Sequence, residues 1–130
     1  MVDIREQRPS VLMDVSNALV RLHKEQFGRG ATRARTYFAG PDALVCVLEE
    51  VLLPAERKLV ALGLQDQVRE SRGSFQVATA SEFIETIEVI LDRKVRAFAS
   101  AIDADADVVF ENFWFEPRES DENHAGPLIA

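Results

Sequence analysis

The sequence predicts a single α+β domain in which a four-stranded, mostly antiparallel sheet carries helices packed on one face. The main observation is the order of the expected elements, α-β-β-α-α-β-β, in which two hairpins occur without a β-α-β crossover. The length of 130 residues suits one domain. An apolar content of 47% is ordinary for a globular chain and can supply a core without disulfides.

The first expected element is an amphipathic helix. Residues 1–8 are polar and predict a frayed lead-in, and Pro9 suits the first turn of a helix. Apolar residues then recur at spacings of three and four up to about Phe27: Leu12, Val15, Leu19 and Leu22. Gly28 follows as the residue expected to take a left-handed conformation and end the helix.

A hairpin is expected next. Thr32–Ala39 and Asp42–Glu50 have strand-like composition, and Gly40-Pro41-Asp42 between them is typical of a turn. Alternation along the first strand predicts two faces. One face carries Arg33, Arg35 and Tyr37, and the other carries Ala34, Thr36 and Phe38.

Two further helices are expected after the hairpin. Pro54 suits the first turn of a short helix that ends at Gly63. A longer helix is predicted from Gln65 to Arg93, and the sequence leaves open whether it kinks or breaks at Gly73-Ser74.

Lys94–Ile102 and Val108–Glu116 predict the second pair of strands, which closes a domain spanning residues 9–117. Residues 118–130 are polar and predict a flexible tail. The last strand has apolar residues on both faces, Val109, Phe113 and Phe115 on one and Val108, Phe110 and Trp114 on the other. Because two long helices cover about one face of such a sheet, we expect a homodimer to cover the second.

The charge distribution is uneven. The net charge is −7, yet residues 1–62 carry nine Lys/Arg against eight Asp/Glu, whereas residues 63–130 carry six against fourteen. An acidic chain is a poor ligand for nucleic acid, so we expect no nucleic-acid partner. The basic residues cluster between residues 21 and 35, and this cluster could hold a small anion or an acidic partner surface.

The sequence also predicts a cytoplasmic protein that does not insert into a membrane. The N-terminal residues lack the apolar run of a signal peptide, and no stretch approaches 18 uninterrupted apolar residues. The single cysteine, Cys46, cannot form an internal disulfide, as expected in a reducing compartment.

No metal site, cofactor or catalytic residue is predicted. Asp103-x-Asp-x-Asp107 lacks the Gly and Glu of a calcium loop, because Val108 and Trp114 occupy those positions. His23 has no neighbouring ligand type in the sequence, and Cys46 lies in an apolar strand where a buried thiol is expected.

The segment Gly28–Arg35 is the predicted binding site. Gly28 and Gly30 could present backbone N–H groups, and Arg29, Arg33 and Arg35 could supply guanidinium groups to a carboxylate, carbonate or phosphate. The alternative is a helix-ending turn followed by an exposed, charged strand face.

Three motifs carry a family resemblance: the KEQFGRG turn, the hairpin after it, and the L-x-PAE start of the second helix. Over roughly Val11 to Pro117 the chain resembles the MpsC-type component of a sodium-translocating, membrane-potential-generating system, first described as a domain of unknown function. Two positions depart from the family pattern: Ala31 replaces a Pro, and Leu53 replaces a Thr that would cap the second helix. The resemblance implies an accessory role beside membrane systems for cation or inorganic-carbon uptake.

Two hypotheses follow. The first is a non-enzymatic, homodimeric, cytoplasmic accessory or regulatory protein that docks on a membrane-protein partner through Arg29, Arg33 and Arg35. The second is a small-anion enzyme acting on bicarbonate or a carboxylate, with His23 as general base and the arginines as a clamp. The enzyme requires His23 and the arginines to converge in a concave pocket, whereas the docking protein requires the arginines on an open surface.

Overall fold

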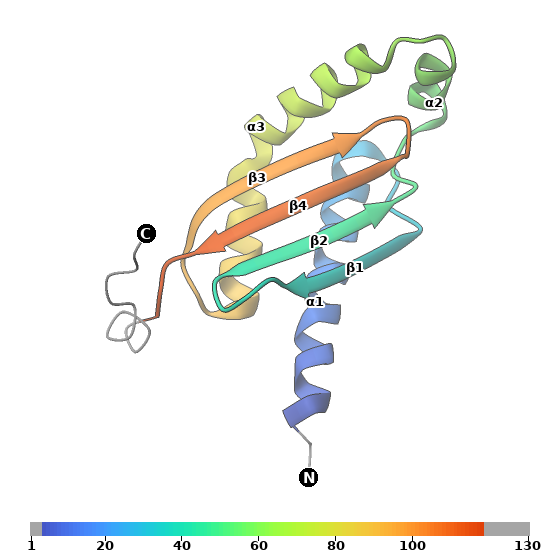
Figure 1. The fold of residues 1–130 in the computed structure, drawn as a ribbon. Coiled ribbons are helices and arrows are strands. Elements are labelled where there is room, and N and C mark those ends of the chain that lie inside the picture. Colours follow the sequence, from blue (N-terminus) through green and yellow to red (C-terminus); the bar gives the residue numbers. More distant parts are fainter. Residues whose placement is uncertain (1–3, 119–130) are drawn as a thin grey trace.

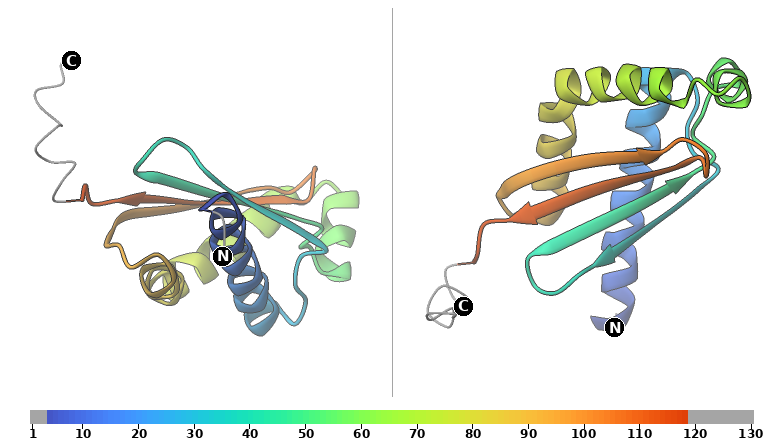
Figure 2. Two further views of the ribbon diagram at one scale, coloured as in Figure 1. Left: turned by 90° about the horizontal axis from the view of Figure 1, so that it is seen from below. Right: turned by 45° about the horizontal axis from the view of Figure 1, so that its top comes forward.

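The computed structural model describes the backbone of residues 4–118 and the side chains of residues 11–118. Its elements follow the expected order: α1 Ile4–Phe27, β1 Arg33–Phe38, β2 Ala43–Glu49, α2 Pro54–Ala61, α3 Gln65–Leu91, β3 Val95–Asp103 and β4 Val108–Phe115. The strands form one sheet in the order β1-β2-β4-β3, and every neighbouring pair is antiparallel. Helices α1 and α3 lie on the same side of this sheet (Figures 1 and 2). The predicted α+β fold is therefore confirmed.

Helix α1 is longer than the sequence suggested. It begins at Ile4, so the expectation of a frayed lead-in is wrong for residues 4–8, and Pro9 lies inside the helix instead of in its first turn. Residues 5–7 are Arg, Glu and Gln, which have high helix propensity and favour extending the helix backwards from Pro9. The other end agrees with the prediction, because Gly28 has φ +80° and its N–H donates to the Lys24 carbonyl oxygen at 2.8 Å.

Helix α3 is continuous, so Gly73 does not break it. It bends, however, in the yellow-green stretch of Figures 1 and 2, and its two halves run in different directions. The hydroxyl groups of Ser74 and Thr79 donate to the carbonyl oxygens of Glu70 and Phe75, four residues earlier. Such bonds compete with the backbone ladder and are a known cause of helix bending.

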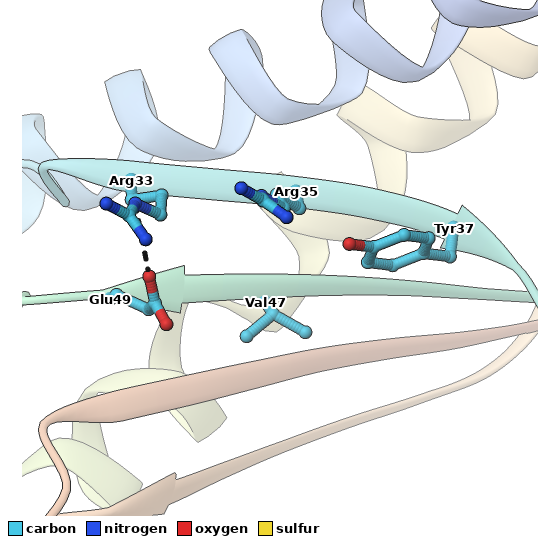
Figure 3. Close-up of a pocket in the computed structure, with 5 residues that line it drawn as sticks. All are labelled: Arg33, Arg35, Tyr37, Val47 and Glu49. Atoms are coloured by element: carbon cyan, nitrogen blue, oxygen red, sulfur yellow. Dashed lines mark ion pairs between the residues drawn. The ribbon is translucent and has the colours of Figure 1, made fainter.

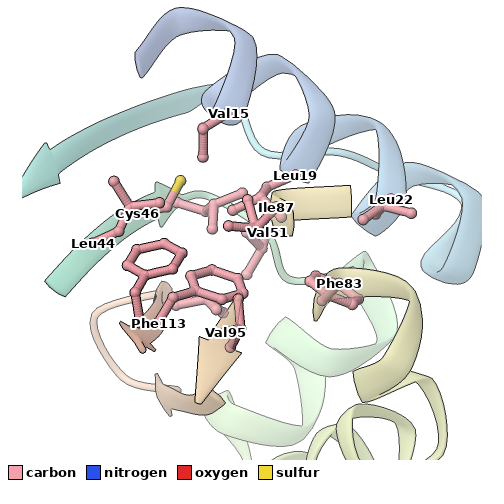
Figure 4. Packing of buried hydrophobic residues seen from close by; sticks show 13 residues of the cluster. Val15, Leu19, Leu22, Leu44, Cys46, Val51, Phe83, Ile87, Val95 and Phe113 are labelled. Carbon is pink, nitrogen blue, oxygen red and sulfur yellow. The ribbon is translucent and has the colours of Figure 1, made fainter. Parts of the chain in front are cut away.

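The face of the sheet that packs against α1 and α3, here called the covered face, holds the core (Figure 4). Alternate residues of β2 and β4 point into it: Leu44, Cys46, Leu48, Val109, Glu111, Phe113 and Phe115. The rings of Phe98 and Phe113 stack with centroids 4.7 Å apart, and Phe83 stacks on Phe98 at 5.7 Å. Burial raises the pKa of the Cys46 thiol to about 11, so the thiol remains protonated at neutral pH.

On the opposite face, here called the open face, residues 4–118 place no helix (Figure 2). The two faces predicted for β1 and β4 are confirmed, because Arg33, Arg35 and Tyr37 are exposed whereas Thr36 is buried. Tyr37, Phe110 and Trp114 are 51%, 38% and 49% exposed on the open face. Residues 11–118 therefore leave an apolar sheet surface uncovered.

A buried ion pair joins α2 to α3. Arg72 is 1% exposed and donates to both carboxylate oxygens of Glu56, at 2.6 and 2.8 Å, and to the Val51 carbonyl oxygen at 3.1 Å. Glu56 also accepts the N–H of Leu53 at 2.8 Å, so half of a capping box survives without a polar side chain at Leu53. Burial alone would raise the pKa of Glu56, but the hydrogen bonds from Arg72 and Leu53 outweigh it and hold that pKa below its usual value.

Candidate functional site

Strand β1 presents its basic side chains at the edge of the open face. Arg33, Arg35 and Tyr37 project side by side from β1 over β2 (Figure 3). They line a shallow hollow of about 220 Å³ whose remaining walls are Val47 and Glu49 of β2. Because β1 is the outermost strand, this hollow is open to solvent along one side.

The two strand arginines differ in how their charge is neutralised. The Arg33 Nε atom lies 3.5 Å from Oε2 of Glu49, with both side chains well exposed. Two other carboxylates of this half of the chain pair elsewhere, Glu25 with Arg21 and Glu56 with Arg72. Among residues 11–118, no carboxylate forms an ion pair with Arg35, so its positive charge faces solvent directly.

Arg29 lies at the same end of the hairpin as Arg33. Its Nε donates to the carbonyl oxygen of Glu50 at 3.4 Å, and Glu50 directly follows Glu49, the residue that pairs with Arg33. Arg29 is half-buried. We call Arg29, Arg33 and Arg35 together the basic edge.

The glycines of this segment have structural roles. The Gly28 N–H already bonds to Lys24, so it is not free to bind an anion as the sequence suggested. At Gly30, an added Cβ would lie 2.9 Å from Cγ1 of Val20 and 3.2 Å from its carbonyl oxygen. Gly30 therefore allows the turn to pack closely against α1.

His23 lies away from the basic edge. It is 2% exposed between α1 and the covered face, where its Nε2 is 3.2 Å from Oε1 of Glu111. Phe27 and Phe83 lie beside its ring. Arg33 and Arg35 are on the opposite side of the sheet, so the structure does not bring His23 together with these two arginines as an active site would need.

Glu111 is the polar residue that sequence reasoning missed. It is fully buried, and Ser100 Oγ donates to its Oε1 at 2.8 Å beside His23. Alternation along β4 indicates that Glu111 is buried, because it lies on the same face of the strand as the buried Val109 and Phe113. A carboxylate in that register requires a buried polar partner, which a single strand pattern cannot identify.

The acidic turn between β3 and β4 stabilises a neighbouring loop. Oδ1 of Asp107 accepts the N–H groups of Val51 and Leu52 at 2.8 and 2.9 Å, and its Oδ2 lies 3.3 Å from Arg57. Within the described part of the chain, no group of three or more His, Cys, Asp or Glu side chains is arranged to hold a metal ion. None of the helices within residues 4–118 combines the length and the apolar character needed to cross a bilayer.

Comparison with known proteins supports one assignment. Neither a curated protein nor a solved structure matches the chain. A family model described as "Na+-translocating membrane potential-generating system (MpsC)" matches residues 7–117, which include every strand of the sheet and nearly all of the helical residues. The chain therefore belongs to the MpsC family.

Proposed function

We propose that the protein is a non-enzymatic, cytoplasmic accessory or regulatory component of a Na+-translocating, membrane-potential-generating system, acting beside the membrane systems that take up cations or inorganic carbon. It works as a homodimer and docks on a membrane-embedded partner through the basic edge. Family membership supports the link to such a system. The observation that carries the docking role is the exposed guanidinium group of Arg35, which has no carboxylate partner among residues 11–118.

The electrostatics of the basic edge favour an acidic partner surface. Arg33 and Arg35 are two residues apart on one strand, so their side chains emerge about 7 Å apart on the same face. Glu49 balances the charge of Arg33 only, and a partner carboxylate would balance Arg35. Since these groups are exposed, the attraction should weaken as salt screens it.

The enzyme hypothesis has less support. Its general base, His23, is buried against Glu111 on the far side of the sheet. A small anion in the hollow beside Arg33 and Arg35 would meet Tyr37, Val47 and Glu49 instead. Bicarbonate or a carboxylate could therefore occupy the hollow as a bound ion, without a base placed to act on it.

The test is affinity capture from a native membrane fraction with three baits. The wild type should recover subunits of a cation-translocating membrane complex, identified by mass spectrometry. Arg33→Ala/Arg35→Ala should lose them. The matched control is Arg21→Ala/Arg69→Ala, which removes the same charge from two exposed arginines that pair within their own helices.

Equal recovery by the wild type and the Arg33→Ala/Arg35→Ala variant would reject the basic edge as the docking site. Equal loss with both variants would mean that net charge, and not this edge, governs capture. Raising the salt concentration during the wild-type capture should reduce recovery progressively.

A further inference from the structure

We infer that the open face binds the open face of a second copy of the chain, about a two-fold axis that runs parallel to the strands between β2 and β4. This inference rests on the homodimer of the proposed function and specifies its surface and register. Three properties of the open face support it: its composition, the sizes of its side chains and its charges.

The composition of the open face is that of an interface core. Most of the side chains on this face are apolar: Ala43, Val45, Val47, Ala97, Ala99, Ala101, Val108, Phe110 and Trp114, with Tyr37 at the rim. Its charged residues, Arg33, Arg35, Glu49 and Asp103, lie in the two rows at one end. Asn112 is the polar residue near the centre, and its Nδ2 already donates to the Ala99 carbonyl oxygen at 3.2 Å. Apolar sheet faces of this kind pack face to face in β-sandwiches.

Side-chain size differs sharply between the two edges of this face. Edge strand β1 presents Arg33, Arg35 and Tyr37, whereas edge strand β3 presents Ala97, Ala99 and Ala101. A two-fold axis parallel to the strands lays β1 of one copy over β3 of the other. In the observed register, Tyr37 then faces Ala99 of the second copy.

The inner strands match in the same way. The same axis places β2 over β4 of the second copy, so Trp114 faces Ala43 and Phe110 faces Val47. A two-fold axis perpendicular to the strands would instead lay β1 on β1 and β3 on β3. Arg35 would then face Tyr37, and Ala99 would face Ala101, which crowds one edge and leaves a void at the other.

The charges select the same axis. Arg33 and Asp103 occupy the same row of the sheet at opposite edges, joined through the pairs Arg33–Glu49, Glu49–Val108 and Val108–Asp103. The axis parallel to the strands brings each Arg33 opposite Asp103 of the second copy, twice per dimer. Both side chains are exposed in the single chain, and Arg33 is long enough to span the offset that sheet twist introduces.

The area is adequate for a moderate affinity. A four-stranded face of this length measures on the order of 20 Å by 20 Å, so two such faces bury roughly 1,000 Å² with their side-chain relief. This lies at the lower end for specific interfaces, and we expect dissociation on dilution. In this dimer Arg33 pairs with Asp103 of the second copy, whereas Arg35 lies at the rim, where interface residues remain accessible, so Arg29 and Arg35 can still bind another partner.

The first experiment introduces a charged side chain into the proposed interface. Sedimentation equilibrium of the wild type should give a dimer of 14.5 kDa chains at micromolar concentration. Ala99→Glu should raise the dissociation constant at least about 100-fold, because it buries a carboxylate beneath Tyr37 of the second copy. The matched control is Ala78→Glu, the same change at an exposed position of α3, and it should dimerise like the wild type.

The outcomes separate the inference from the docking proposal. A wild type that is monomeric at all concentrations would overturn the dimer and its register, while capture through the basic edge could still be observed. A dimer unaffected by Ala99→Glu would overturn the open face as the interface. Loss of dimer in both Glu variants would also count against it.

The second experiment tests the axis by mixing two charge-reversal variants. In a homodimer of Asp103→Arg, two guanidinium groups face each other at both contacts. In a homodimer of Arg33→Asp, two carboxylates face each other at both contacts. Like charges repel, so each variant should form only a weak homodimer. Mixed together, the two variants restore an opposite-charge pair at both contacts, and native mass spectrometry should show predominantly heterodimer. A statistical mixture of species would reject the axis parallel to the strands, and the thermal midpoint of each variant checks that both are folded.

Discussion

Neighbouring residues of one strand differ in exposure according to which face of the sheet they lie on. Phe113 and Trp114 are adjacent in β4, yet Phe113 is 2% exposed and stacked on Phe98, whereas Trp114 is 49% exposed. The same strand therefore supplies one aromatic residue to the core and another to the surface. A residue on the covered face should govern folding, and a residue on the open face should govern association.

The two arginine–carboxylate pairs also differ in exposure between the two sides of the sheet. The Arg72–Glu56 pair on the helical side is bidentate, and the Arg72 side chain is 1% exposed. The Arg33–Glu49 pair on the open face is longer, at 3.5 Å, and its side chains are 65% and 41% exposed. Identical chemistry should therefore contribute to stability on one side and remain available for binding on the other.

The largest expected effect comes from the aromatic pair. Phe113→Ala should lower the free energy of unfolding by about 3–5 kcal/mol, because it leaves a cavity between Phe98 and the helices. Trp114→Ala should lower it by no more than about 1 kcal/mol when measured by urea denaturation below the dimer's dissociation constant. Equal losses for the two variants would mean that the open face is buried within a single chain.

The next effect comes from the ion pairs. Arg72→Ala should cost about 3 kcal/mol, because Glu56 would lose its cation and the Val51 carbonyl oxygen its donor. Arg33→Ala should cost less than about 1 kcal/mol by the same measurement. A loss of several kcal/mol at Arg33 would show that its pair with Glu49 is structural.

Acid should affect the buried pair through Glu56. Its pKa is lowered in the folded chain, so its contribution to stability is complete above pH 4.5 and is lost as the pH falls through the folded pKa. Glu56→Gln should therefore be less stable than the wild type at pH 7, and the difference should shrink below pH 4.5. Urea denaturation of both proteins from about pH 7 to about pH 3 measures this, and a difference independent of pH would contradict the assignment.

A smaller effect is expected where α1 ends. Gly28→Ala should cost about 1 kcal/mol, because φ +80° is unfavourable for a residue with a Cβ. An added Cβ there contacts nothing within 4 Å, so the loss comes from the backbone alone. Thermal denaturation measures it, and an unchanged midpoint would mean that the helix end rearranges without cost.

Local patterns predicted most of the fold. Turn residues and alternation located each strand to within one residue at either end and assigned Arg33, Arg35 and Tyr37 to one face. The start of α1 was misplaced because Pro9 was weighed above the helix propensity of the residues before it. In α3, the hydroxyl-to-backbone bonds of Ser74 and Thr79, which favour bending, are not specified by a residue pattern.

The site was predictable only in part, because its distinguishing contacts join distant segments. Nothing local to His23 indicates Glu111, which is 88 residues away in the chain and reaches it only after the sheet forms. Likewise, a residue pattern alone cannot choose among Glu25, Glu49 and Glu56 as partners for the arginines, and the strand register places Glu49 opposite Arg33. The absence of a partner for Arg35 among residues 11–118 could be seen only once the others were assigned.

The smallest expected effect on stability is also the most informative about function. Arg33→Ala/Arg35→Ala should change the free energy of unfolding by less than about 1 kcal/mol, because both side chains are exposed and only Arg33 has an ion pair within residues 11–118. Removing two neighbouring positive charges also relieves their mutual repulsion, which offsets the lost pair with Glu49. Urea denaturation at low and high salt measures both contributions, since salt should narrow the difference between variant and wild type. A loss above about 2 kcal/mol would show that the arginines hold the hairpin together, and the docking role assigned to them would then have no support from their exposure.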